Sequence, residues 1–372
     1  MSKLKIYPTG VLRYSMKTNI PNMLTKFAGL YSSLLPKNIQ VPMKVKLIAM
    51  PSHKALLPNI SNSPVAKFPE IDILIPFHPK DVSLLIYCLT NVVRNSINPV
   101  GTVRIVTTHL GVPIVERELE ALREDEIFQN VRFDVIDENE FLPSTIMDAC
   151  RSLGEGSGWL IKQSIFFWNA VKNRVNPTVV IDSDTLIIQR ILWIDGASRS
   201  NVFANFHEND LSDYFIKMFP NVLRVEKDFG FVSHFVLVKP QVVLEFLLQV
   251  EQSEMLQGPS AQLASGEVDL EIRLAKVLAT LIQKCMFNFC DFDFYAKAAL
   301  KIEPEKTLIC KWSNVALDVN EKVDDVMLQH FLRKNQSKYL SVSIHTFSLT
   351  FSGSTRTQEI IESRLKAEET TK

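Results

Sequence analysis

The feature that most constrains the fold is a regular alternation of short apolar runs with longer amphipathic stretches across residues 71–181. Short runs rich in β-branched residues are typical of buried strands, and a 3.6-residue apolar period is typical of helices. Strands are expected at 71–76, 103–107, 131–136 and 178–181, and helices at 81–95, 113–126 and 159–172. This order predicts an α/β fold, in which a mostly parallel, Rossmann-like central sheet is flanked by helices and joined by right-handed crossovers.

The fourth predicted strand ends in two aspartates, Asp182 and Asp184. Alternate side chains of a strand point the same way, so both carboxylates are expected to leave the core together. Parallel sheets bind ligands at the C-terminal ends of their strands, where His78 also follows the first strand. Carboxylates are hard oxygen ligands for Mg²⁺ or Mn²⁺, ions that hold phosphorylated substrates. The alternative is a polar loop after a strand, because D-x-D often occurs by chance.

The pattern is less regular after residue 185. Further strands are expected at 202–206, 231–238, 308–311 and 339–344, and helices at 210–218, 241–254 and 268–285. His234 falls inside the second of these strands, where it is either a buried core histidine or a substrate contact. Residues 287–295 form an aromatic-rich run with Asp291 and Asp293 at alternate positions; the alternative to a functional role is a loop with two solvated acids.

The composition fits a globular, enzyme-sized protein in a reducing compartment. The chain has 372 residues, of which 46% are hydrophobic and 22% charged. Its 5 cysteines are scattered, which argues against a disulfide framework and against a zinc site. We see neither the run of about 20 apolar residues that spans a bilayer nor the apolar core of a signal peptide. A cytoplasmic location is therefore expected.

The net charge is zero, but the charges are unevenly distributed. No acidic residue precedes Glu70, while the same stretch carries ten basic residues, or +10; the remaining 31 basic and 41 acidic residues give −10. Apolar residues recur at helical spacing across residues 23–35, so a basic amphipathic helix could make peripheral contact with an anionic membrane. The alternative is a helix packed on the domain behind it. No nucleic-acid partner is expected, because no recognised binding motif accompanies the charge.

Composition also divides the chain into three parts. Prolines and serines between residues 51 and 69 indicate a linker, and the chain becomes polar and charged from Ser352 onward. We expect a basic N-terminal extension and linker at 1–69, a catalytic domain at 70–350 and a polar C-terminal tail at 351–372.

Two enzyme families use an apolar strand that ends in D-x-D. The D-x-D-x-T signature of haloacid-dehalogenase-like phosphatases is matched by Asp182 to Thr185, and would make Asp182 a phosphoryl-accepting nucleophile. That family opens its core domain with this strand, whereas at least three strand–helix units precede it in this chain. The family also needs paired acids after a later strand, but Asp324-Asp325 is expected to open a helix.

The second family is the nucleotide-sugar glycosyltransferases of the GT-A fold, whose fourth strand ends in D-x-D. The chain resembles a poorly characterised bacterial group of these enzymes across residues 71–348. The matching blocks are Gly158-Trp159 with Lys162-Gln163, then residues 180–185, 231–234, 289–295 and 343–345. That group usually has glutamine where Lys162 stands, and longer acids where Asp291 and Asp293 stand, a departure that bears on acceptor specificity.

The resemblance implies a role for each candidate residue. Asp182, Asp184 and His345 would hold Mn²⁺ or Mg²⁺, and one of Asp291 and Asp293 would accept the proton of the acceptor hydroxyl. Contacts to the donor are assigned to His78, Lys162, Gln163 and Asp182, and contacts to substrate to Trp159 and His234. The alternatives are a solvated helix lysine for Lys162 and a surface or capping histidine for His345.

The sequence thus predicts a metal-dependent glycosyltransferase that moves a sugar from a nucleotide-sugar donor to the hydroxyl of a glycan or glycolipid acceptor. The alternatives are a haloacid-dehalogenase-like phosphatase with Asp182 as nucleophile, and a non-catalytic GT-A-like protein that binds a glycan or a partner protein.

Overall fold

The computed structural model describes residues 6–7, 68–154, 156–204, 230–253, 269–285, 289–318 and 325–345. Most of the predicted extension at 1–69, the predicted helix at 210–218 and the predicted tail at 351–372 lie outside the described residues.

A five-stranded sheet forms the centre of the molecule. Its strands follow the order β4 (Arg132–Asp137), β3 (Val100–Thr107), β2 (Ile71–Pro76), β5 (Thr178–Ile181) and β8 (Phe235–Val238). The first four strands are parallel, and β8 pairs antiparallel with β5. The predicted α/β fold with a mostly parallel central sheet is therefore confirmed. The expected strand at 231–238 is shorter than predicted, because pairing begins only at Phe235.

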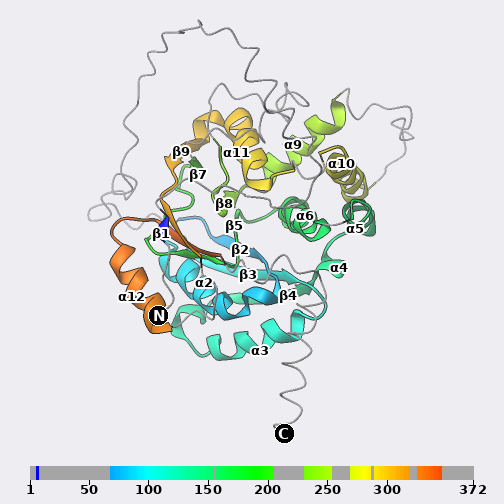
Figure 1. Ribbon diagram of the computed structural model, residues 1–372. Coiled ribbons are helices and arrows are strands. Elements are labelled where there is room, and N and C mark those ends of the chain that lie inside the picture. Colours follow the sequence, from blue (N-terminus) through cyan, green and yellow to red (C-terminus); the bar gives the residue numbers. More distant parts are fainter. Residues whose placement is uncertain are drawn as a thin grey trace, which may run out of the picture.

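Helices cover both faces of this sheet (Figure 1). α2 (Val82–Asn95) and α3 (Val112–Leu122) lie on one face, and α5 (Ser144–Arg151), α6 (Ser157–Lys172) and α10 (Leu270–Cys285) lie on the other. Ile73 and Ile75 of β2 belong to the apolar cluster on the first face, and Leu74 belongs to the cluster on the second. Burial on both faces explains why β2 has a nearly unbroken apolar sequence.

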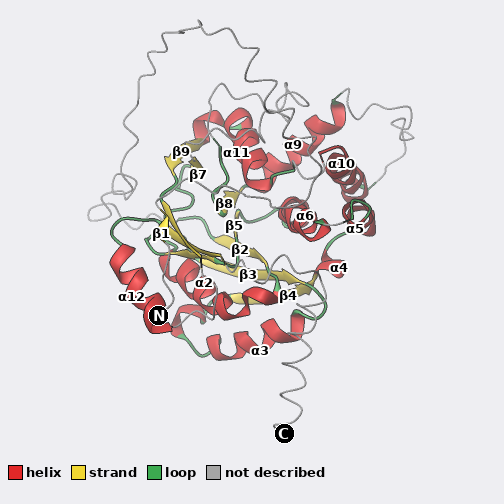
Figure 2. Cartoon of the chain, viewed as in Figure 1, coloured by secondary structure: helices red, strands yellow, loops and turns green. Residues whose placement is uncertain are grey.

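Two smaller sheets extend the centre (Figure 2). One contains β1 (Ile6–Tyr7), β10 (Asn314–Asp318), β11 (Ser341–His345) and β6 (Thr185–Ile187); the other pairs β7 (Ser200–Ala204) with β9 (Thr307–Lys311). Because β6 begins at Thr185, the chain leaves the central sheet at the acidic pair and enters the second sheet directly afterwards.

The remaining elements are helical. They are α4 (Glu138–Phe141), α9 (Pro240–Gln252), α11 (Asp291–Ile302) and α12 (Asp325–Asn335), with 3-10 turns η2 (Pro79–Asp81), η3 (Glu126–Phe128) and η5 (Pro304–Lys306). Asp291 and Asp293 begin a helix, so the loop interpretation of this segment was wrong. Asp325 opens α12, as expected. None of the helices in the described ranges has the length and apolar character needed to cross a membrane.

Candidate metal and donor site

The acidic pair lies at the corner between two sheets. The Asp182 amide donates to the His234 carbonyl at 2.9 Å, which continues the pairing of β5 with β8 by one residue. From the second sheet, the Ile344 amide donates to the Asp184 carbonyl at 2.8 Å. Backbone from both sheets thus fixes the two aspartates at the C-terminal edge of the parallel strands, where such sheets bind ligands.

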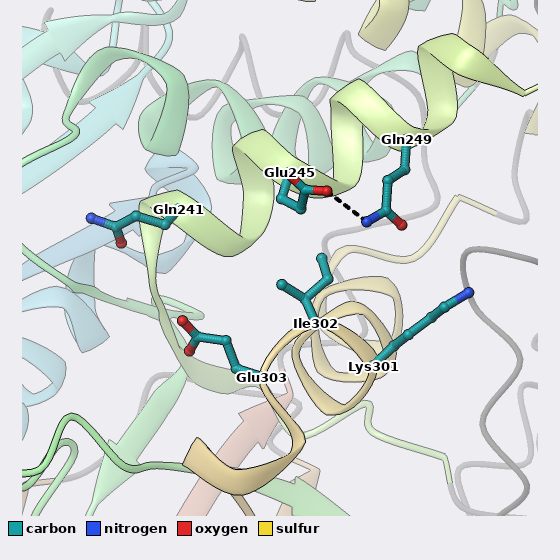
Figure 3. A pocket seen from close by; sticks show the side chains of 6 residues that line it. All are labelled: Gln241, Glu245, Gln249, Lys301, Ile302 and Glu303. Carbon is teal, nitrogen blue, oxygen red and sulfur yellow. Dashed lines mark hydrogen bonds between the residues drawn. The ribbon is translucent and has the colours of Figure 1, made fainter.

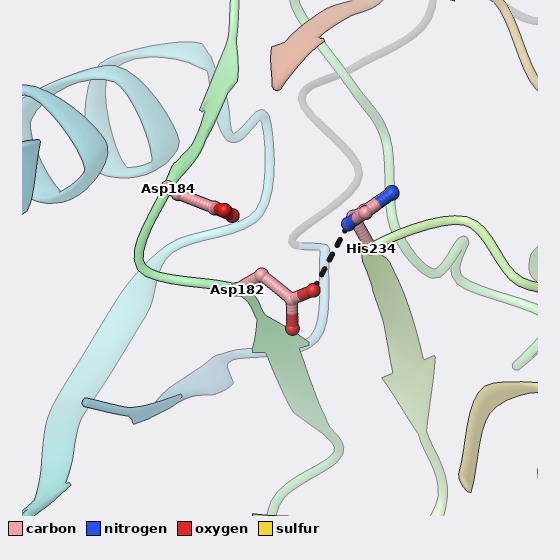
Figure 4. A group of neighbouring side chains, drawn as sticks. All are labelled: Asp182, Asp184 and His234. Atoms are coloured by element: carbon pink, nitrogen blue, oxygen red, sulfur yellow. Dashed lines mark hydrogen bonds and ion pairs between the residues drawn. The ribbon is translucent and has the colours of Figure 1, made fainter. Parts of the chain in front are cut away.

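His234 completes a cluster with the two aspartates (Figure 4). One ligand atom from each of Asp182, Asp184 and His234 lies within 4.8 Å of the others, and His234 Nδ1 is 3.0 Å from Asp182 Oδ2. The prediction that His234 lies inside a strand was wrong, because it precedes β8 and has a left-handed backbone with φ 59°. A non-glycine residue in this conformation persists where its surroundings hold it, often at a functional site.

Lys162 occupies the other oxygen of Asp182. Its Nζ lies 2.7 Å from Asp182 Oδ1, so it is an ion-pairing residue rather than a merely solvated helix lysine. Burial favours the neutral form of Asp182, but Lys162 and His234 outweigh it and hold the pKa of this carboxyl below its usual range. Burial would likewise lower the pKa of Lys162, but Asp182 and Asp291 raise it above the usual lysine value. Both groups are therefore charged at neutral pH.

Gln163 contacts the protein rather than the edge of the sheet. Its Oε1 accepts a hydrogen bond from the Asp291 amide at 2.6 Å, which ties the first turn of α11 to α6. Asp291 is 1% exposed; its Oδ1 accepts from the Phe292 amide at 2.8 Å, while its Oδ2 has no hydrogen-bond partner among the described residues. Burial raises the pKa of Asp291 to about 7, although the charge of Lys162 opposes this shift.

Asp293 joins the same helix turn to the segment before His234. Its Oδ2 forms a buried ion pair with Lys297 at 2.7 Å, and its Oδ1 accepts from the Phe231 amide at 3.1 Å. The side chain is thus surrounded by protein partners, and it anchors the backbone three residues ahead of the cluster.

Asp81 was not predicted as a site residue. Its Oδ2 accepts a hydrogen bond from the Ser183 hydroxyl at 3.0 Å, and this bond stabilises the turn between the two aspartates. Burial raises the pKa of Asp81 to about 6; Lys80 opposes the rise and Asp184 adds to it. Its position after β2, at the same sheet edge as the cluster, is the feature of the sequence that could have indicated it. His78 lies at this edge too, on the surface, where its Nδ1 accepts from the Lys80 amide at 3.2 Å.

One tryptophan contacts the cluster, and another lies close to Lys162 in α6. The ring of Trp312, between β9 and β10, has its centroid 5.3 Å from that of His234, a contact that no sequence pattern indicated. Trp159 is partly exposed in the first turn of α6, three residues before Lys162 and on the same side of the helix.

His345 ends β11, next to the Ile344 amide that bonds to Asp184. Its backbone therefore lies beside the acidic pair, as the sequence suggested. The structure does not describe its side chain, so the role of His345 as a metal ligand stays a prediction.

The donor set suits a hard divalent cation. Two carboxylates and an imidazole converge from the end of β5 and the start of β8, and each can offer a lone pair to Mn²⁺ or Mg²⁺. The residues fit such an ion, with Lys162 and His234 already in contact with the two oxygens of Asp182.

A hollow lies between α9 and the C-terminal end of α11 (Figure 3). It has a volume of about 510 Å³, and its lining residues include Glu245, Gln249 and Glu303. Glu245 Oε1 accepts from Gln249 Nε2 at 2.8 Å across one helix turn. The lining contains no residue of the acidic cluster, and the chemistry of the chain is therefore better sought at the sheet corner.

No protein-family model matches this sequence, and no curated protein matches it. Among solved structures, the chain is similar to the WbbM bifunctional glycosyltransferase, with 12% identity, a TM-score of 0.44, and coverage of 78% of this chain and 47% of that one. It is also similar to the galactosyltransferase LgtC in complex with donor and acceptor sugar analogues (10% identity, TM-score 0.35, 79% and 96% coverage). GlyE of Streptococcus pneumoniae TIGR4, another glycosyltransferase, is similar as well (9% identity, TM-score 0.35, 81% and 64% coverage).

This chain thus spans about half the length of WbbM. Each of these TM-scores is below 0.5.

Proposed function

We propose that the chain is a metal-dependent glycosyltransferase of GT-A type, which moves a sugar from a nucleotide-sugar donor to an acceptor hydroxyl. The observation that carries this proposal is the convergence of Asp182, Asp184 and His234 at the C-terminal edge of a mostly parallel sheet. Packing alone gives no reason to place two carboxylates side by side at a strand end, since like charges repel. A bound cation that in turn binds a diphosphate would explain this arrangement.

The side chains have distinct roles in this proposal. Asp182, Asp184 and His234 hold the ion, with His345 as a further ligand from β11. Bound Mn²⁺ or Mg²⁺ would neutralise the charge that develops on the leaving nucleoside diphosphate. His78 and Trp159 are proposed contacts to donor and substrate, because they lie at the sheet edge and at the start of α6. Asp81 keeps the turn in place through Ser183.

The two acids of α11 lie deeper than the cluster. The proposal that one of them accepts the proton of the acceptor hydroxyl still depends on the sequence resemblance. Asp293 already has Lys297 and the Phe231 amide as partners, which leaves Asp291, with its unpartnered Oδ2, as the better candidate of the two.

The position of the D-x-D strand argues against the phosphatase alternative. β5 lies between β2 and β8 in the middle of the sheet, and β2, β3 and β4 all precede it in the chain.

The test is thermal unfolding of the full chain with UDP or GDP, with and without Mn²⁺. The transferase predicts a Mn²⁺-dependent stabilisation by at least one nucleotide, which is lost in Asp182→Ala and in Asp184→Ala. Asp148→Ala, which changes an exposed aspartate on α5, is the matched control and should keep the full response. Stabilisation by phosphate or vanadate alone would favour the phosphatase, and no response to either ligand would favour a binding protein. A donor screen by nucleotide release then identifies the sugar.

We further propose that the acceptor is a glycan or glycolipid and that the extension at 1–69 holds the enzyme beside an anionic membrane. The support is its charge of +10 without a single acidic residue before Glu70. The catalytic domain at 70–350 and the tail at 351–372 complete the proposed division of the chain.

A further inference from the structure

Lys162 lies close to two buried acidic side chains, Asp182 and Asp291. Its Nζ is 2.7 Å from Asp182 Oδ1. The next residue, Gln163, accepts from the Asp291 amide at 2.6 Å, so the start of α11 is fastened next to Lys162. The charge of Asp291 contributes to the raised pKa of Lys162, which places this second carboxylate within electrostatic range.

Each oxygen of Asp182 already has one partner in this arrangement. Lys162 engages Oδ1, and His234 Nδ1 lies 3.0 Å from Oδ2. Each oxygen keeps a further lone pair, so a divalent ion can still bind, but its charge then lies on the same carboxylate as the ammonium of Lys162. Imidazole can itself ligate the ion, whereas a charged ammonium has three donors and no acceptor. Lys162 is thus the partner that the ion repels.

Asp291 offers a place for the displaced ammonium. Its Oδ2 is buried without a hydrogen-bond partner in the described part of the chain, a state that costs stability. The Lys162 side chain is 31% exposed and has a flexible four-carbon stem, so the ammonium has room to turn.

We propose that Lys162 is a displaceable internal counter-ion: it neutralises Asp182 in the metal-free chain and moves to Asp291 when a divalent ion binds to Asp182 and Asp184. This inference rests on the metal site of the proposed function. It makes Lys162 a positioning residue that couples the D-x-D corner to Asp291 in the first turn of α11.

The test is a double-mutant cycle on Mn²⁺ affinity, measured by calorimetry and by electron paramagnetic resonance of the free ion. Lys162→Gln removes the competing charge and should tighten Mn²⁺ binding about fivefold or more. Asp291→Asn removes the second partner of Lys162 and should weaken binding by a similar factor, about fivefold. In the Lys162→Gln background, Asp291→Asn should change the affinity less than about twofold, because no ammonium remains to be moved.

Lys172→Gln is the matched control. Lys172 lies at the other end of α6, where it pairs with Glu271 at 3.1 Å, and its loss should leave the Mn²⁺ affinity unchanged. A second readout needs no substitution of a buried residue. Mg²⁺ should shift the ammonium resonance of Lys162 in the ¹⁵N-labelled protein; this resonance is assigned by its absence in Lys162→Gln. A wild-type resonance that saturating Mg²⁺ does not shift would overturn the inference.

The remaining outcomes separate this inference from the proposed function. Equal Mn²⁺ affinity of wild type and Lys162→Gln would overturn the inference and leave the metal site standing, as would additive effects of the two substitutions. Binding to Lys162→Gln but not to the wild type would also overturn the inference, because Lys162 would then block the ion instead of moving to Asp291. Absence of Mn²⁺ binding in every variant would overturn both the metal site and the inference.

Discussion

The buried ion pair of α11 predicts a large difference between two similar substitutions. Asp293 pairs with Lys297, and Asp195 pairs with Arg199; both pairs have i,i+4 spacing and an N–O distance of 2.7 Å. They differ in exposure, because the side chains of Asp293 and Lys297 are 5% and 3% exposed, whereas that of Arg199 is 53% exposed. Lys297→Met and Arg199→Met remove a charge from each pair and keep much of the aliphatic stem.

The magnitudes follow from burial. Lys297→Met leaves the carboxylate of Asp293 buried without its counter-ion, which typically costs about 3–5 kcal/mol. The hydrogen bond from the Phe231 amide remains, so we expect the lower end, about 3 kcal/mol. Arg199→Met leaves Asp195 with its hydrogen bonds from the Ala197 and Arg199 amides, so the expected loss is about 0.2–1 kcal/mol.

Urea denaturation at pH 7 measures both losses as changes in the free energy of unfolding. Asp293→Asn combined with Lys297→Met should recover part of the loss, because no unpaired charge remains. A loss below about 1 kcal/mol for Lys297→Met, equal to that for Arg199→Met, would refute the reasoning. The pair would then be hydrated, and Asp293 would not anchor the segment before His234 through a buried charge.

Three further predictions concern the site and the extension. Trp312→Leu should weaken Mn²⁺ binding several-fold, because the ring that packs on His234 is lost, whereas Trp159→Leu should leave it unchanged; calorimetry decides. Folded Asp291 keeps its proton up to about pH 7, whereas the unfolded chain loses it at lower pH. The free energy of unfolding of the metal-free wild type, relative to that of Asp291→Asn, should therefore fall as the pH rises towards 7 and stay constant above pH 7. Urea denaturation at a series of pH values measures this difference, and a free energy that rises with pH would contradict the expected sign. Deletion of residues 1–68 should abolish binding to anionic liposomes in a flotation assay, and unchanged binding would disprove the membrane role of the extension.

The sequence predicted the sheet well because strand and helix patterns are local. Burial of β2 and β5 on both faces imposes apolar runs that are visible without any partner. The strand at 231–238 was predicted too long, because Phe231 and Val232 are apolar and continue the local pattern. In the structure, the left-handed backbone of His234 ends the pairing. Residue type gives little indication of such a backbone angle.

For the site, the sequence by itself determined the acidic pair and its position at a strand end. Only the tertiary structure decided its partners. Lys162 contacts Asp182, and Trp312 packs on His234, because the chain turns from one sheet into another after β5; such contacts depend on crossovers and packing rather than on spacing along the chain. The electrostatics were decided in the same way: α6 and the segment before β8 gave Asp182 its two partners, whereas burial left Asp291 with an unpartnered oxygen, although both are aspartates in apolar segments.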